Sequence, residues 1–285
     1  MANPQSAILN PHFGAFWMFF AALVIFIYFF GLTIPLVGPD EPRYAQVARE
    51  MFERGDWVTP TLGGYNWFEK PPLLYWLQIV SYHVFGVSEF AARFGSAVCG
   101  LGTIASLWRL GKTVSAEKLR RGDVGFSNYV LLISASTLGL IVFARGASFD
   151  IVLTFTMTAS LVAFFVYDAR SRRGERQRVL LPLFFFYFFI GVSLLAKGLI
   201  GIVFPFAIVA LYFLIVRRVP TGRFGGSLIW GTTLAVAVSL LWYLPMYVRH
   251  GGEFIDEFFV QHHFTRYTSN KYLHPQPFYF FFWVL

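Results

Sequence analysis

The most informative interval of the sequence begins with Gly38-Pro39-Asp40-Glu41-Pro42-Arg43-Tyr44 and ends with Tyr65-Asn66-Trp67-Phe68-Glu69-Lys70-Pro71-Pro72. It is the longest polar interval in the first 110 residues, and six acidic and four basic side chains lie between Asp40 and Lys70. A charged segment rich in proline and glycine, with apolar runs on both sides, is where a membrane protein places its chemistry.

The composition around this interval is that of a membrane protein. Of the 285 residues, 56% are hydrophobic and 13% are charged, which is about half the charged share of a soluble domain. The apolar residues form long runs and not amphipathic stripes, which predicts an all-α polytopic membrane protein. Residues 1–13 contain no Lys or Arg, so the first apolar run is interpreted as a membrane span and not as a cleaved signal. The one cysteine, Cys99, excludes an internal disulfide and a cysteine metal cluster.

The apolar runs predict one transmembrane domain over residues 1–285. Residues 179–216 are too long for one crossing, since about 20 residues suffice, so they predict a hairpin with its tip at Lys197-Gly198. An apolar run stops at Leu285, from which we expect the N-terminal part of a longer protein. The predicted spans are 14–37, 90–111, 124–143, 151–167, 179–196, 199–216, 227–247 and an incomplete 277–285, with external loops 38–89 and 248–276.

The net charge of +8 does not indicate a nucleic-acid partner, because the basic residues lie in short loops between apolar runs. Three such loops, near 112–121, 170–178 and 217–223, are separated by pairs of crossings and therefore share one side. The positive-inside rule makes that side cytoplasmic. Asp150, Lys197 and the interval 248–275 then face the outside.

The side on which Asp40 lies depends on residues 72–87. If this run spans the membrane, Asp40 is inside; if it lies in the interface, Asp40 is outside beside Asp150. The run is short, carries Gln78, Ser81 and His83, and follows Pro71-Pro72. These features favour the interfacial placement.

Two carboxylates stand at the ends of predicted helices. Residues 41–54 have the apolar spacing of an amphipathic helix, and Asp40 stands at the N-cap position, where it could cap, catalyse or do both. Asp150 is a structural residue at a helix start, a structural ion-pair partner of Arg145, or a second functional carboxylate. Their joint position at the outer ends of spans favours function.

Several cations could contact a phosphate. Lys70 is either an interfacial anchor or a phosphate ligand, and Arg43 and Arg93 are further candidates. Lys197 has the same two interpretations, and there we favour the anchor.

In the interval 248–275, His262-His263 would point to different faces of a helix, which disfavours a metal site made by the pair alone. One of them together with Glu69 could bind a divalent ion. The alternative is an interfacial loop with belt aromatics.

Taken together, these motifs resemble the GT-C superfamily of lipid-linked-sugar glycosyltransferases, in particular the bacterial aminoarabinose transferase and protein-mannosyltransferase-like branch. The resemblance runs over essentially the whole chain. It implies a GT-C-type transmembrane helix bundle with interfacial helices in the first external loop. The segments that carry it are Gly38 to Ala45, Phe68-Glu69-Lys70-Pro71-Pro72-Leu73, Phe85 to Phe94, the turn from Arg145 to Asp150, His262 to Tyr267, and His274-Pro275.

The resemblance also implies roles for residues. Asp40 matches the principal catalytic carboxylate, and Asp150 matches a second acidic residue. Glu69 with His262 or His263 resembles a pair that binds a divalent metal ion. The other expected positions are Lys70, Arg43 and Arg266 at the donor phosphate and Tyr44, Tyr65 and Arg145 in the substrate cavity.

The implied function is an inverting glycosyltransferase with a polyprenyl-phosphate sugar donor. The acceptor would be lipid A, another cell-envelope glycan or a protein, on the periplasmic face of a bacterial inner membrane, with membrane lipids as the remaining partners. A transporter or flippase is the alternative from another class, but it would place ionisable residues near mid-span. Here the charges gather at span ends.

Overall fold

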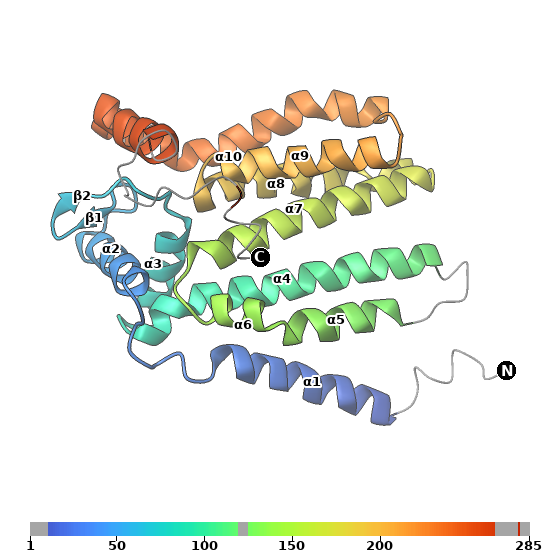
Figure 1. Ribbon diagram of the computed structural model, residues 1–285, viewed down its shortest axis with the longest axis horizontal. Helices are drawn as coiled ribbons and strands as arrows, with labels where there is room; N and C mark the ends of the chain where they lie inside the picture. The colour runs from blue at the N-terminus through green and yellow to red at the C-terminus, as the bar shows by residue number, and fades with distance from the viewer. Residues whose placement is uncertain (1–10, 119–124, 266–278, 280–285) are drawn as a thin grey trace.

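The computed structural model describes residues 11–118, 125–265 and 279, in which long helices lie side by side as a bundle (Figure 1). Shorter elements gather at one end of this bundle. In chain order the elements are α1 (Pro11–Phe29), α2 (Asp40–Arg54), β1 (Thr61–Leu62), β2 (Tyr65–Asn66), α3 (Leu73–Phe85), α4 (Glu89–Lys118), α5 (Phe126–Ser136), α6 (Leu138–Ala144), α7 (Phe149–Arg172), a 3-10 turn (Arg176–Arg178), α8 (Leu180–Lys197), α9 (Ile200–Ile215), α10 (Gly222–Phe254) and a π-helical segment (Ile255–Thr265).

The described helices confirm an all-α polytopic membrane protein. By length and composition, α4, α7, α8 and α10 with its continuation can each cross a bilayer. The pair α5 and α6 makes a fifth crossing if it counts as one bent span. The helices α1, α3 and α9 are apolar but shorter.

The run 124–143 is not one straight helix. It bends by 55° between α5 and α6, where Thr137 has extended backbone angles. The hydroxyl groups of Ser136 and Thr137 donate to the carbonyl groups of Leu132 and Ile133, four residues earlier. Such bonds compete with the helical ladder and favour a bend.

Two other helix ends differ from the sequence-based spans. α1 ends at Phe29 and not near residue 37, and Gly31 follows with a positive φ of 72°. α10 runs from Gly222 to Phe254, so the first part of the expected loop 248–276 is helical, with a kink at Gly251. At both places a glycine has a positive φ, which interrupts regular helical geometry and which glycine adopts at little cost.

The hairpin predicted within 179–216 is confirmed. α8 ends at Lys197, Gly198 turns with φ +73°, and α9 begins at Ile200. α8 also packs closely on α10, because a Cβ on Gly191 would lie 2.7 Å from the carbonyl oxygen of Ala235. Small residues allow such close approach between membrane helices.

The polar end of the bundle is built from α2, α3 and the β1–β2 hairpin (Figure 1). α2 is the amphipathic helix that the spacing predicted; it buries Tyr44, Val47, Ala48 and Met51 against α3 in a core shared with α4 and α7. α3 has 13 residues and is about 20 Å long at 1.5 Å per residue, which is too short for a bilayer core of about 30 Å. This length agrees with the interfacial placement of residues 72–87.

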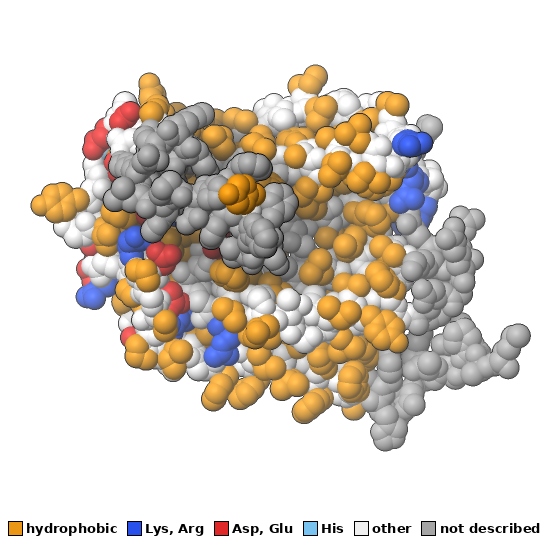
Figure 2. Space-filling view, in the orientation of Figure 1, with side chains coloured by type: hydrophobic (Ala, Val, Ile, Leu, Met, Phe, Trp, Pro, Cys, Tyr) orange, Lys and Arg blue, Asp and Glu red, His pale blue; other side chains and the backbone are white. Residues whose placement is uncertain are grey.

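Charge is distributed unevenly between the two ends of the bundle. Figure 2 shows acidic and basic side chains together at the end that carries α2, whereas the coloured charges at the opposite end of this face are basic. Hydrophobic side chains cover the surface between them. Such an apolar belt between two polar ends is expected of a membrane-embedded bundle.

Candidate active site

A polar cavity of about 430 Å³ lies at the α2 end of the bundle. Four segments that are distant in the sequence meet there: the start of α2, the loop before α3, the α6–α7 turn and the end of α8. Its polar lining combines acidic and basic side chains, which suits a charged ligand more than an apolar one. The lining residues are Asp40, Glu41, Arg43, Tyr44, Glu69, Lys70, Val142, Phe143, Gly146, Ala147, Ser148, Phe149, Asp150 and Lys197.

One wall of the cavity is a chain of alternating charges. The Arg43 guanidinium pairs with the Asp40 carboxylate and lies 4.0 Å from Glu69. The Glu69 carboxylate in turn lies 3.2 Å from the Lys70 ammonium. Asp40 is well exposed, whereas Glu69 and Lys70 each retain 16% exposure. Two half-buried cations therefore stand beside an accessible carboxylate.

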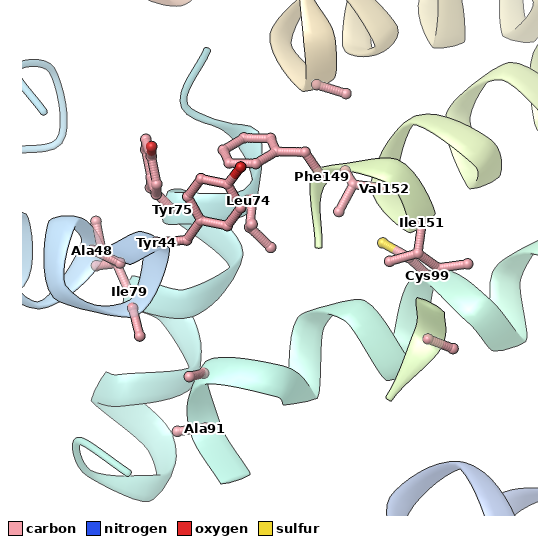
Figure 3. Packing of buried hydrophobic residues seen from close by; sticks show 14 of the residues in the cluster. Tyr44, Ala48, Leu74, Tyr75, Ile79, Ala91, Cys99, Phe149, Ile151 and Val152 are labelled. Atoms are coloured by element: carbon pink, nitrogen blue, oxygen red, sulfur yellow. The ribbon is translucent and has the colours of Figure 1, made fainter. Parts of the chain in front are cut away.

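Aromatic rings hold this wall in place. Arg43 lies over the rings of Tyr44 and Trp67, at 5.4 and 5.7 Å from their centroids. Tyr44 meets Phe149 edge to face at 4.9 Å, and Tyr75 of α3 meets the same ring at 5.3 Å (Figure 3). Burial raises the pKa of Tyr44, so its hydroxyl stays protonated at neutral pH.

The opposite wall carries Asp150, in the first turn of α7, which Ser148 caps by accepting the Asp150 N–H. The Asp150 carboxylate pairs with Lys197 from the end of α8 and not with Arg145. The Arg145 guanidinium instead donates to the carbonyl oxygen of Ile27. The anchor interpretation of Lys197 is therefore wrong, because its amine faces the cavity.

Glu41 links the two walls from behind, although the sequence analysis did not single it out. Its carboxylate accepts hydrogen bonds from the N–H of Val37 at 2.7 Å and of Ala147 at 2.6 Å, and two from Arg93 at 3.1 and 2.7 Å. Burial alone would raise the pKa of Glu41, but these bonds outweigh it and lower the pKa. Glu41 thereby ties the start of α2 to the turn that leads to Asp150.

This arrangement corrects two sequence-based interpretations. Arg93 does not face a phosphate: it is 2% exposed, and besides Glu41 its guanidinium donates to the carbonyl groups of Leu32, Ile34 and Pro35. Asp40 does not cap α2, because the helix starts at Asp40 itself and its N-cap residue is Pro39, which forms no side-chain cap bond.

The other predicted site residues lie apart from the cavity or outside the described residues. Tyr65 lies in β2 with 81% exposure and does not line the cavity. Arg145 lines a neighbouring hollow together with Glu41 and Arg93. Arg266 lies outside the described residues, as do the side chains of His262 and His263. Their roles stay predictions.

A metal site is not assembled by the described side chains. Among them, no three His, Cys, Asp or Glu residues come together to hold an ion. Both oxygens of Glu69 are close to the cations Arg43 and Lys70, which makes this carboxylate a poor ligand for a divalent ion in the arrangement seen. The metal stays a prediction, and no step below depends on it.

The β1–β2 hairpin that carries Tyr65 is held by Glu50 of α2. The hairpin turns at Gly63-Gly64, both with positive φ, as the two central residues of a type I′ turn have. The Glu50 carboxylate accepts from the N–H groups of these glycines at 2.8 and 3.2 Å and from the Thr61 hydroxyl at 2.6 Å. Burial would raise the pKa of Glu50, yet these bonds lower it to about 2.

Acid is expected to loosen this hairpin. Because the pKa of Glu50 is lower in the folded state than its ordinary value of 4.5, its stabilising effect is complete above that value and is lost as pH falls from 4.5 toward 2. Hydrogen exchange of residues 61–66, corrected for intrinsic rates, should show protection decreasing over that window. Glu50→Gln should lower the protection of residues 61–66 at pH 7 and remove its dependence on pH. Glu53→Gln, on the exposed side of α2, should change neither the protection at pH 7 nor its pH dependence. An unchanged profile in Glu50→Gln would contradict the assignment.

The sequence and fold were compared with known proteins. Two relatives are named undecaprenyl phosphate-alpha-4-amino-4-deoxy-L-arabinose arabinosyl transferase. The one from Aeromonas hydrophila is 30% identical over 265 residues, covering 90% of this chain and 46% of its own. The one from Serratia proteamaculans is 31% identical over 282 residues, covering 92% of this chain and 46% of its own length. The chain thus spans about half the length of the curated relatives it matches.

Solved structures match the fold. ArnT from Cupriavidus metallidurans bound to undecaprenyl phosphate superposes with a TM-score of 0.77 at 28% identity, over 94% of this chain and 47% of that one. The apo state of that protein gives a TM-score of 0.73, over 89% of this chain and 45% of that one. This agreement confirms the GT-C-type transmembrane bundle.

A family model described as dolichyl-phosphate-mannose-protein mannosyltransferase matches residues 15–252. This range covers most of the chain and contains every described residue that lines the cavity. The chain therefore belongs to the dolichyl-phosphate-mannose-protein mannosyltransferase family.

Proposed function

We propose that this chain carries the donor-binding and catalytic cavity of an inverting glycosyltransferase that uses a polyprenyl-phosphate-linked sugar. The observation that carries the proposal is the cavity itself, in which Asp40 and Asp150 stand with Arg43, Lys70 and Lys197 at one end of a membrane bundle. The cations suit a lipid phosphate, and the carboxylates suit a sugar and an acceptor. A transporter is disfavoured because these charges lie at helix ends and not at mid-span.

The cations would act on the leaving group. When the bond between the anomeric carbon and the phosphate oxygen breaks, its electrons stay on the phosphate, so negative charge grows there. Lys70 and Arg43 would stabilise this charge more in the transition state than in the ground state, which is what accelerates a reaction. Both are partly buried and fixed by Glu69 and by aromatic rings, so little reorganisation is needed.

The role of Asp40 depends on the acceptor. For a hydroxyl acceptor, Asp40 would take the proton as the oxygen attacks the anomeric carbon, acting as a general base. For a phosphate acceptor no strong base is needed, and Asp40 would position the acceptor or stabilise positive charge on the sugar. In either case a single displacement forms the new bond on the face opposite to the departing phosphate and inverts the configuration.

The comparisons suggest substrates for this proposal. The named relatives act with undecaprenyl phosphate-alpha-4-amino-4-deoxy-L-arabinose, and a matching structure binds undecaprenyl phosphate. We propose a donor of this class and, as acceptor, lipid A or another envelope glycan or protein. The positive-inside rule supports a cavity on the periplasmic face of a bacterial inner membrane.

Lys70→Met tests donor recognition. Loss of a charge-assisted contact costs about 1.5–3 kcal/mol, so kcat/KM for the donor should fall about 10- to 100-fold. The measurement is sugar transfer by the full-length protein in proteoliposomes, with undecaprenyl-phosphate donors added. Lys112→Met is the matched control, because the Lys112 amine lies over the Trp108 ring and does not line the cavity. The activity of this variant should stay at the wild-type value. Unchanged kinetics in Lys70→Met would remove Lys70 from the donor site, and a wild-type protein that transfers no sugar from such donors would refute the function.

A further inference from the structure

A second groove lies on α7 between α4 and α8, apart from the cavity that contains Asp40. It encloses about 530 Å³ and is lined by apolar side chains apart from Ser106, Arg109 and Arg170. Its size falls within the range of about 300–1,000 Å³ that is typical of ligand sites. The cavity with Asp40 and the groove share no lining residue.

The residues that line the groove extend along most of α7. Its lining includes small residues of α4 and α7, among them Ala105, Ala159 and Ala163, and aromatic rings such as Phe155 and Phe189. It follows α7 from Phe155 to Arg170, fifteen residues, which is about 22 Å at 1.5 Å per residue. A groove of this length, lined mostly by apolar side chains, suits a lipid acyl chain.

The two arginines stand toward the basic end of the groove. α4 and α7 run in the same direction (Figure 1). Gly102 of α4 and Phe155 of α7 lie at the same height along the two helices, because a Cβ on Gly102 would lie 2.6 Å from the Phe155 ring. From this level Arg109 lies seven residues further along α4 and Arg170 fifteen residues further along α7, or about 10 and 22 Å. Both guanidinium groups therefore lie toward the end that carries the basic loops, Arg109 at the greater depth.

These arginines have unused hydrogen-bonding capacity. Arg170 donates one hydrogen bond, at 2.8 Å, to the carbonyl oxygen of Arg178. In the described part of the chain, Arg109 makes no ion pair or side-chain hydrogen bond, and none of the residues that line the groove is acidic. A cation at membrane depth without a carboxylate is costly unless another anion accompanies it.

We propose that this groove binds an anionic phospholipid from the leaflet on the side of the basic loops. Its headgroup phosphate lies between Arg109 and Arg170, and one acyl chain extends along α7 past Ala163 and Ala159 toward Phe155. Charge complementarity selects the phosphate, and the apolar channel selects the chain. The site is independent of the sugar-transfer reaction proposed above.

Native mass spectrometry of the full chain in detergent, titrated with dioleoyl phosphatidylglycerol or dioleoyl phosphatidylcholine, tests the proposal. Wild type should retain phosphatidylglycerol preferentially. Each basic residue near an anionic headgroup contributes about 1 kcal/mol, so the double variant Arg109→Gln/Arg170→Gln should bind phosphatidylglycerol about 25-fold more weakly. The double variant Arg173→Gln/Arg217→Gln removes the same charge near the same end but outside the groove, and it should bind like wild type.

Ala105→Phe is a second, independent test, because the larger side chain fills the groove while both arginines are kept. This variant should also lose phosphatidylglycerol binding. Equal retention of both phospholipids by wild type would overturn the proposal. So would full binding of phosphatidylglycerol by the double arginine variant or by Ala105→Phe. If the double arginine variant fails to fold by circular dichroism, the outcome with Ala105→Phe decides.

Discussion

Asp40→Asn is expected to lower kcat about 10²- to 10⁴-fold, the usual contribution of a positioned general acid or base, while the affinity for the donor changes little. Asparagine keeps the size of the side chain but cannot accept a proton or stabilise positive charge on the sugar. Asp40 is accessible and its partner Arg43 lies at the surface of the same cavity, so the fold should tolerate the change. Single-turnover transfer in proteoliposomes separates the chemical step from binding.

Glu53→Gln is the matched control for this experiment. Glu53 lies on the same helix, is half-exposed and pairs with Arg49 on the side of α2 away from the cavity. Its activity should equal that of wild type. Activity of Asp40→Asn close to wild type would exclude Asp40 as the essential carboxylate, and a similar loss in both variants would indicate damage to α2 instead of to the reaction.

Arg93→Met is expected to give the largest loss of stability, about 3–5 kcal/mol, because removing one partner of a buried ion pair leaves the other charge uncompensated. Arg93 and Glu41 are 2% and 13% exposed. The substitution also removes the donor from the carbonyl groups of Leu32 and Pro35. Because Glu41 also bonds the turn before Asp150, transfer activity should fall together with stability.

The exposed pair Arg49–Glu53 provides the comparison. Both side chains are more than half exposed, and such solvent-screened surface pairs contribute little to stability. Equilibrium unfolding in mixed micelles should therefore show a small change for Arg49→Met and a large one for Arg93→Met. Equal, small changes in both variants would contradict the role of the Glu41–Arg93 pair.

Local features of this protein could be predicted from its sequence. The apolar runs predicted the membrane class, and the spacing of Tyr44, Val47 and Met51 predicted which face of α2 is buried. Lys197-Gly198 was predicted as a hairpin tip because 179–216 exceeds one crossing. Each of these features depends on periodicity or length within one segment, which neighbouring residues determine.

Contacts between residues on different helices could not be predicted from the sequence and are seen only in the tertiary structure. Lys197 and Asp150 are 47 residues apart and Arg93 and Glu41 are 52 apart, and no local pattern states which way either cation faces. Arg93 resembled a phosphate ligand as much as Arg43 did, and Tyr65 resembled a cavity residue as much as Tyr44 did. The membrane class, the α2 helix and the α8–α9 hairpin could therefore be predicted without the tertiary structure. The packing of α2, α4, α7 and α8 decided which charges face the cavity and which support it from behind, because the rotation and register between helices follow from many side-chain contacts at once.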